Sequence, residues 1–242
     1  MAHAEKASDM IEKEELSFFQ GVKDCIPTLL GYISIGLAAG MIGVASGLSV
    51  LEIGLMSLLV YAGAAQFIMS GMFAVSSPAT AIIFTTFIVN LRHFLMCATL
   101  APHFSRYSAW RNIGIGALVT DESFGVAAGR IFNGKPINDH WMNGLNVTAY
   151  VTWIASCVTG ALLSKWISDP EKFGLDFALT AMFVALLVLQ LGSVKASKLK
   201  HYLTLITLMI VAMYLFSFFL STDIAVILST VIVATIGVVT DR

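Results

Sequence analysis

Residues 79–102 read ATAIIFTTFIVNLRHFLMCATLAP, an apolar run whose middle holds the polar segment NLRH (residues 90–93). A helix needs about 20 residues to cross the hydrocarbon core of a bilayer, so this run is long enough. A second run, residues 112–131, is interrupted near its middle by TDE (residues 120–122). If the two runs are consecutive antiparallel helices, a cation and two acids lie at similar depth, where hydrocarbon does not solvate charges. The sequence therefore predicts that these segments meet near mid-membrane.

The composition of the whole chain indicates a membrane protein. Hydrophobic residues make up 57% and charged residues 12% of the 242 residues, and the mean hydropathy is +0.85. Soluble domains carry roughly 25% charged residues. We therefore expect an all-α polytopic membrane protein with about eight hydrophobic helices, located in the cell membrane, with no cofactor and no nucleic-acid partner. The apolar runs are residues 25–45, 51–75, 79–102, 112–131, 144–166, 173–192, 202–220 and 224–240.

The predicted domains are an N-terminal tail, residues 1–24, and a single transmembrane domain, residues 25–242. The tail lacks the apolar core of a signal peptide, and its mixture of charged and apolar residues suggests an amphipathic helix on the membrane surface. A frayed tail is the alternative. Eight spans with a cytoplasmic N-terminus place the connection Arg106–Arg111 outside. Seven spans with a re-entrant segment at 112–131 place the N-terminus outside instead. We prefer eight, because lysine and arginine favour the cytoplasm and the tail carries three lysines against two arginines in that connection.

Small residues in the first two runs have two interpretations. Pro27, Gly31, Gly36 and Gly40 lie in the first run, and Gly63 lies in the second. Small residues four apart let membrane helices approach closely, which is the packing interpretation. The functional interpretation is a broken or flexible first helix whose freed backbone groups face a substrate.

A faint internal repeat relates the two halves of the chain. Tyr32 and the Gly-Leu pair at Gly54 recur as Tyr150 and the Gly-Leu pair at Gly174, at nearly the same separation. Apolar sequence also produces such matches by chance. A real repeat of three spans would give inverted halves, and one of four spans would give parallel halves.

Polar residues within the membrane suggest the binding of a small zwitterion. Arg92 is expected to hold a substrate carboxylate or to keep one acid ionised, while Asp121 or Glu122 meets an ammonium group or carries a coupling proton. His93 is a candidate proton relay, although an intramembrane histidine is more often a hydrogen-bonding packing residue. The alternative is a static ion-pair network that only clamps helices together. The candidate substrate-binding and proton-coupling residues are Tyr61, Gln66, Asn90, Arg92, His93, Thr120, Asp121 and Glu122.

Three motifs, in this order and spacing, resemble the AzlC family, the large permease subunit of branched-chain amino acid exporters. They are YAGAAQF at 61–67, NLRH at 90–93 and TDESF at 120–124, and the resemblance covers roughly residues 18–239. The resemblance implies a secondary transporter in the bacterial inner membrane that exports Leu, Ile, Val or Met. It also implies a small membrane partner subunit of the AzlD type.

Two other classes of function are weighed against export. A passive small-solute channel would use the same helices but would need no titrating group. An intramembrane enzyme is less favoured, because the sequence has no H-E-x-x-H, G-x-S-x-G or Walker motif. No metal site is expected, because Cys25, Cys97 and Cys157 are dispersed and Arg92 would repel a divalent cation from His93.

Overall fold

The computed structural model describes residues 16–166, 196–220 and 222–240, together with positions 177, 181, 184, 187, 188, 191, 192 and 194. The chain divides into two compact units, Met1–Phe183 and Val184–Arg242, which are described separately. All of the described elements are helices, and the expected all-α polytopic membrane class is confirmed. Four helical stretches are long and apolar enough to cross a membrane: Phe18–Ala45, Ala79–Phe104, Asp139–Leu163 and Ser197–Ser217.

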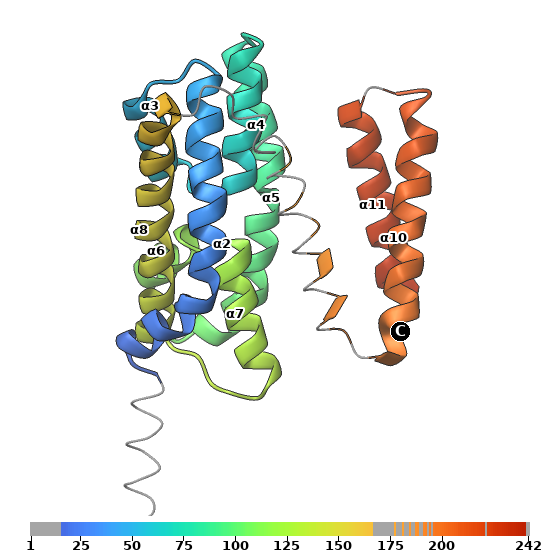
Figure 1. The fold of residues 1–242 in the computed structure, drawn as a ribbon. Coiled ribbons are helices and arrows are strands. Elements are labelled where there is room, and N and C mark those ends of the chain that lie inside the picture. The colour runs from blue at the N-terminus through green and yellow to red at the C-terminus, as the bar shows by residue number, and fades with distance from the viewer. Residues whose placement is uncertain are drawn as a thin grey trace, which may run out of the picture. The chain divides into compact units, whose positions relative to one another are not determined.

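The described residues of the first unit form three long helices and two pairs of short ones (Figure 1). The long helices are α2 (Phe18–Ala45), α5 (Ala79–Phe104) and α8 (Asp139–Leu163), which continues into the 3-10 turn η1 (Ser164–Trp166). The short pairs are α3 (Val50–Leu59) with α4 (Gly63–Ala74), and α6 (Ala109–Ala117) with α7 (Asp121–Phe132). The second unit contains α10 (Ala196–Ser217) and α11 (Thr222–Thr240).

Helices α2 and α8 pack closely and run parallel (Figure 1). Near the start of both helices, a Cβ added at Gly21 would overlap the backbone of Trp141. Near their ends, a Cβ added at Gly40 would overlap the backbone of Cys157. Contacts that advance together along both chains define a parallel pair, and only glycine allows backbones to approach this closely. This pair is the centre of the first unit.

The interpretation of the first run as a broken helix is wrong. Helix α2 is continuous through Pro27 and begins at Phe18 rather than at residue 25. The packing interpretation holds for Gly36 and Gly40, which lie against α8, whereas a Cβ added at Gly31 would meet nothing within 4 Å. The breaks lie instead in the second and fourth apolar runs.

The second run does not cross the membrane as one helix. A Cβ added at Gly54 in α3 would contact Val158, and the backbone carbonyl of Leu58 accepts a hydrogen bond from Tyr150 at 2.7 Å. Later residues of α3 therefore contact earlier residues of α8. Helix α3 thus runs antiparallel to α8, away from the end at which α2 finishes.

Helix α4 then returns in the direction from which α3 came. Gly63 at its start faces the ring of Trp153, and the Gln66 side chain reaches Cys157, further along α8. The pair α3 and α4 is therefore a re-entrant hairpin with its break at residues 60–62. The prediction that residues 51–75 form a single spanning helix is wrong, because the chain turns back at that break.

The fourth run is also a re-entrant hairpin, and it enters from the opposite end of the unit. In α6, Arg111 pairs with Asp139, and the carbonyl of Ile115 accepts from Asn146, so α6 runs parallel to α8. In α7, Arg130 pairs with Asp24 near the start of α2, so α7 returns to the end from which α6 came. The re-entrant alternative for residues 112–131 is therefore the one that the structure contains.

The two hairpins change the predicted topology of the first half. With α3–α4 and α6–α7 both re-entrant, α2, α5 and α8 are the helices that cross the first unit among its described residues. The α2 start, the α5–α6 connection and the α7–α8 connection then lie at one end. That end holds Lys23, Arg106, Arg111, Arg130 and Lys135. The eight-span arrangement, which put Arg106 and Arg111 opposite the tail, is wrong, because two of its spans turn back.

Helices α10 and α11 form an antiparallel hairpin within the second unit. Leu205 lies against Gly237, and Val233 and Met209 line the same groove between the helices. Most of the sixth apolar run, residues 173–192, lies outside the described residues, as do residues 1–15 of the tail. Gly174 of the internal repeat lies outside them too, and the repeat and the single membrane domain stay predictions.

Candidate functional site

The breaks of the two re-entrant hairpins line one narrow pocket between α2, α5 and α8. Its empty volume is about 310 Å³, but it has room for the centre of only about one water molecule. Six of the predicted site residues lie in its wall. The lining residues are Tyr32, Tyr61, Ala62, Gly63, Ala64, Arg92, His93, Thr120, Asp121, Glu122 and Trp153.

The predicted meeting of Arg92 with the Asp121–Glu122 pair takes place through Asp121. Nη1 of Arg92 lies 2.9 Å from Oδ2 of Asp121, and the two side chains are 25% and 21% exposed. Arg92 comes from the middle of α5, and Asp121 is the first residue of α7. An acid at a helix N-terminus is stabilised by the free amides of the first turn, and the guanidinium adds a second favourable interaction. The ion pair therefore joins α5 to the tip of the α6–α7 hairpin.

Thr120 fixes the break of the α6–α7 hairpin. Its hydroxyl accepts a hydrogen bond from the amide of Ser123, and the Ser123 hydroxyl accepts one from the amide of Thr120, which is a capping box. Thr120 also forms a short hydrogen bond with the Tyr32 hydroxyl on α2. A capping box satisfies amides that a helix start would otherwise leave unpaired. The α7 start is thus capped, acidic and anchored to α2.

Glu122 and His93 are the titratable residues of the pocket that lie next to this pair. Glu122 lies in the first turn of α7, and within the described ranges no lysine or arginine lies within ion-pair distance of it. His93 follows Arg92 on α5, and both nitrogens of its ring are buried without a hydrogen-bond partner among the residues described. A carboxyl group and an imidazole in one pocket can take up and pass on a proton.

The break of the α3–α4 hairpin has hydrogen-bond donors where the break of the α6–α7 hairpin has acids. Ala62 occupies the N-cap position of α4 and has no side chain that can cap it. Tyr61 precedes it, and the Tyr61 hydroxyl is buried without a partner in the part of the chain that the structure describes. The first turn of α4 contains no acidic residue. The start of α4 therefore exposes donor groups to the pocket, where the start of α7 exposes carboxylates.

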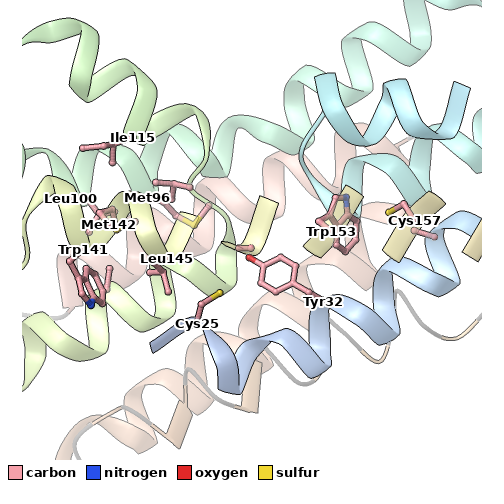
Figure 2. Close-up of a cluster of buried hydrophobic side chains, with 14 of the residues drawn as sticks. Cys25, Tyr32, Met96, Leu100, Ile115, Trp141, Met142, Leu145, Trp153 and Cys157 are labelled. Carbon is pink, nitrogen blue, oxygen red and sulfur yellow. The ribbon is translucent and has the colours of Figure 1, made fainter. Parts of the chain in front are cut away.

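Tyr32 and Trp153 are pocket residues that the sequence reasoning missed. Their rings meet edge to face, with centroids 6.1 Å apart, and Figure 2 shows both side chains beside the α2–α8 contact. Tyrosine and tryptophan in membrane proteins usually gather at the membrane interfaces. Both residues lie near the middle of long spanning helices instead. A polar aromatic residue in mid-span was the signal that could have identified them.

Gln66 and Asn90 are predicted site residues that do not line the pocket. The fully buried Gln66 amide donates hydrogen bonds to the carbonyls of Val60 at 2.7 Å and Met56 at 3.3 Å, at the end of α3. It therefore holds the α3–α4 hairpin closed. The Asn90 Oδ1 atom is buried without a partner in the described segments. The binding role of both residues stays a prediction.

An apolar groove adjoins the pocket between α5 and α6. Val119, which precedes Thr120 of the pocket, forms part of its wall. Its empty volume, open solvent included, is about 940 Å³. The other lining residues are Cys97, Leu100, Ala101, Phe104, Asn112, Ile113, Ile115, Gly116 and Ala117. A charged pocket next to an apolar groove suits a ligand that is charged at one end and aliphatic at the other.

Comparison with known proteins identifies the family. The family model described as AzlC protein matches residues 27–167. The Escherichia coli (strain K12) inner membrane protein YgaZ is 27% identical over 177 residues, covering 71% of this chain and 72% of that protein. The Bacillus subtilis (strain 168) branched-chain amino acid transport protein AzlC is 24% identical over 178 residues, covering 73% of this chain and 67% of that protein. No solved structure matches this chain significantly. Because the family match covers most of the first unit and more than half of the chain, this multi-pass membrane protein belongs to the AzlC family.

Proposed function

We propose that this protein is a secondary transporter that exports branched-chain amino acids (Leu, Ile or Val, and also Met). We propose that it acts in the bacterial inner membrane as the large subunit of a permease with a small AzlD-type partner. The observation that carries the proposal is the meeting of two re-entrant hairpins, from opposite ends, at a pocket with a cation and two acids. The printed name of the Bacillus subtilis relative supports the substrate class.

The residues of the pocket have separate roles in this proposal. Arg92 keeps Asp121 ionised through their ion pair. Glu122, which has no such partner among the described residues, meets the substrate ammonium group or carries the coupling proton. His93 passes that proton on, a role supported by the lack of a hydrogen-bond partner for either ring nitrogen among the described residues. The apolar groove next to Thr120 takes the aliphatic side chain.

The two hairpins suit alternating access to the pocket. Broken helices at a central site, arranged from opposite sides, are a common feature of secondary transporters. The pocket holds only about one water, so an amino acid can enter only when one hairpin moves away from the long helices. Movement of α3–α4 would open the pocket toward one membrane face, and movement of α6–α7 toward the other. If the pocket residues only held the helices together in an ion-pair network, two hairpins that enter from opposite ends would not be needed.

Counterflow of radiolabelled leucine in proteoliposomes tests the proposal. The vesicles would contain the chain with or without an AzlD-type subunit, and with or without a pH gradient. We expect leucine flux that responds to the pH gradient and is competed by isoleucine and valine but not by lysine. Flux that ignores the gradient would indicate a passive channel. The absence of substrate-dependent flux under all of these conditions would refute the export proposal.

A further inference from the structure

We infer that the substrate carboxylate binds at the start of α4, between its free amides, the Tyr61 hydroxyl and the Trp153 indole nitrogen, and not at Arg92. This inference rests on the proposed function, because it names the receptor for one pole of the amino-acid substrate. It assigns the ammonium pole to the opposite side of the pocket, at the start of α7. The two hairpin breaks then divide the zwitterion between them.

The start of α4 has unused hydrogen-bond donors. Gly63 and Ala64 are its first two residues, both line the pocket, and neither amide has an acceptor in the described part of the chain. Ala62 cannot cap them through its side chain. Free amides and the positive end of the helix dipole attract an anionic group. Most helices satisfy these amides with a side chain or water, so an uncapped start in a pocket suits a ligand oxygen.

Trp153 supplies the independent observation that points to a ligand. The residue is only 3% exposed, it lines the same pocket, and its Nε1 atom is buried without a hydrogen-bond partner among the described residues. The tip of its six-membered ring faces α4, since a Cβ added at Gly63 would lie 3.0 Å from Cη2, 3.4 Å from Cζ2 and 3.7 Å from Cζ3, and Nε1 belongs to the Cζ2 side of the indole. A buried donor without an acceptor destabilises the protein, because it has lost its hydrogen bond to water. A bound carboxylate would remove this destabilisation.

The α7 side of the pocket is unsuited to a carboxylate. Its first turn contains Asp121 and Glu122, and the capping box of Thr120 and Ser123 pairs the amides of those two residues. Arg92 already holds the Asp121 carboxylate at 2.9 Å. A substrate carboxylate there would approach two acids, while an ammonium group would be attracted by them. The uncapped α4 start and the acidic α7 start therefore match the two poles of an amino acid.

Direct binding measurements on Trp153→Phe test the assignment. Isothermal titration of the purified full chain in nanodiscs would use leucine, leucinamide, which lacks the carboxylate, and 4-methylpentanoate, which lacks the ammonium group. We expect Trp153→Phe to raise the Kd of leucine and of 4-methylpentanoate about tenfold, the effect of one hydrogen bond to a charged group. The Kd of leucinamide should stay within about twofold, since it has no carboxylate for the indole to bind.

Two further variants are measured with the same three ligands as Trp153→Phe. Trp141→Phe is the matched control, because Trp141 lies on the same helix but donates its indole hydrogen bond to Asp24 outside the pocket. It should leave all three Kd values unchanged. Tyr61→Phe removes the second unpartnered donor of the proposed site, the Tyr61 hydroxyl, and should repeat the Trp153→Phe pattern, which keeps the assignment testable if Trp153→Phe does not fold.

The outcomes separate this inference from the proposed function. If leucine binds the wild type and both pocket variants equally, or if the variants weaken leucine and leucinamide by the same factor, the carboxylate assignment is wrong while the export proposal stands. If the wild type ignores leucine but binds 4-methylpentanoate in a Trp153-dependent way, the carboxylate site stands and the amino-acid proposal fails. Binding of none of the three ligands refutes both.

Discussion

At the residue scale, the two adjacent acids of the pocket differ in what surrounds them. Asp121 is bonded to Arg92, whereas Glu122 lies one residue further along α7 without a cationic partner in the described segments. Adjacent helical residues project about 100° apart, which separates the two carboxylates. A structural role for the first acid and a transport role for the second can therefore be distinguished by substitution.

Asp121→Asn should destabilise the fold. The substitution removes the Asp121 carboxylate from its ion pair with Arg92, and we expect a loss of about 2 kcal/mol in unfolding free energy, less than the ~3–5 kcal/mol of fully buried pairs. Both side chains are partly exposed, which is why the loss is smaller. Thermal unfolding in detergent measures this effect. The double variant Arg92→Gln with Asp121→Asn should recover part of the loss, and an additive double variant would contradict the pairing.

Glu122→Gln should leave stability almost unchanged but remove coupling. We expect the unfolding free energy to stay within about 0.5 kcal/mol, since no ion pair is broken. Leucine flux driven by a pH gradient should fall about tenfold or more, because an amide cannot carry the proton. The measurement is proteoliposome flux with Asp121→Asn in parallel. Full activity of a stably folded Glu122→Gln protein would remove Glu122 from the mechanism.

At the element scale, close backbone packing and two interrupted runs determine the first unit. Helix α2 lies against α8 through glycines, and each hairpin turns back at a break that faces this pair. The α6–α7 break has a capping box, but the α3–α4 break has no side-chain cap and depends on Gln66 instead. The glycine contacts between α2 and α8 and the Gln66 hydrogen bonds can each be tested by substitution.

Gly40→Ala should loosen the α2–α8 contact, while Gly31→Ala should not. The added Cβ at Gly40 would overlap the Cys157 backbone, whereas at Gly31 it meets nothing within 4 Å. Overpacking costs about 1–3 kcal/mol, so we expect the melting temperature of Gly40→Ala to fall by about 4 °C or more. Gly31→Ala should raise it slightly, because alanine favours helix. Equal melting temperatures for the two variants would contradict the packing.

Gln66→Leu should open the α3–α4 hairpin locally. The substitution removes the hydrogen bonds to the carbonyls of Val60 and Met56. Each carbonyl keeps one backbone donor, the amide of Val60 for Met56 and the amide of Ala62 for Val60, so what is lost is the link between α3 and α4. A side-chain hydrogen bond contributes about 1 kcal/mol, and we expect faster amide hydrogen exchange across residues 56–66 and little change in α8. Hydrogen exchange with mass spectrometry measures both regions. Unchanged exchange across the hairpin would show that Gln66 does not hold it.

At the scale of the whole first unit, the hairpins place charged connections together at one end. Five lysine and arginine residues lie at the end where α2 begins (Lys23, Arg106, Arg111, Arg130 and Lys135), and Lys165 of η1 lies at the other end. Lysine and arginine favour the cytoplasmic side of membranes. We therefore expect the start of α2 to face the cytoplasm, an orientation that leaves fewer lysine and arginine residues of the first unit outside than the eight-span arrangement does.

Cysteine labelling in intact cells and inverted vesicles should show this topology. Ser105→Cys and Lys135→Cys should react from the same, cytoplasmic side, because α6–α7 returns to its own end. Ser76→Cys, between α4 and α5, should react from the opposite side. The unsubstituted chain is the labelling control, since Cys25 and Cys157 are buried and Cys97 is partly buried. If positions 105 and 135 react from opposite sides of the membrane, residues 112–131 cross it and the re-entrant assignment is wrong.

The sequence by itself determined the membrane class, most helix locations and the polar residues of the pocket. Hydropathy reflects transfer into hydrocarbon, which depends on composition, and lone charges in apolar runs must find each other wherever the chain folds. Arg92 could therefore be matched with the Asp121–Glu122 pair from the sequence alone, whereas the structure decided that Asp121 is the acid it binds. The family followed from the spacing of three motifs.

Only the tertiary structure decided where helices break and in which direction they continue. An apolar run long enough to cross the membrane has the same hydropathy whether it crosses or turns back, so residues 51–75 gave no sign of the break at Tyr61. The break is supported by distant groups, namely the Gln66 amide and the Trp153 ring against Gly63. Backbone groups can leave the helix in a membrane only where protein surrounds them. The site therefore depends on packing that local sequence does not encode.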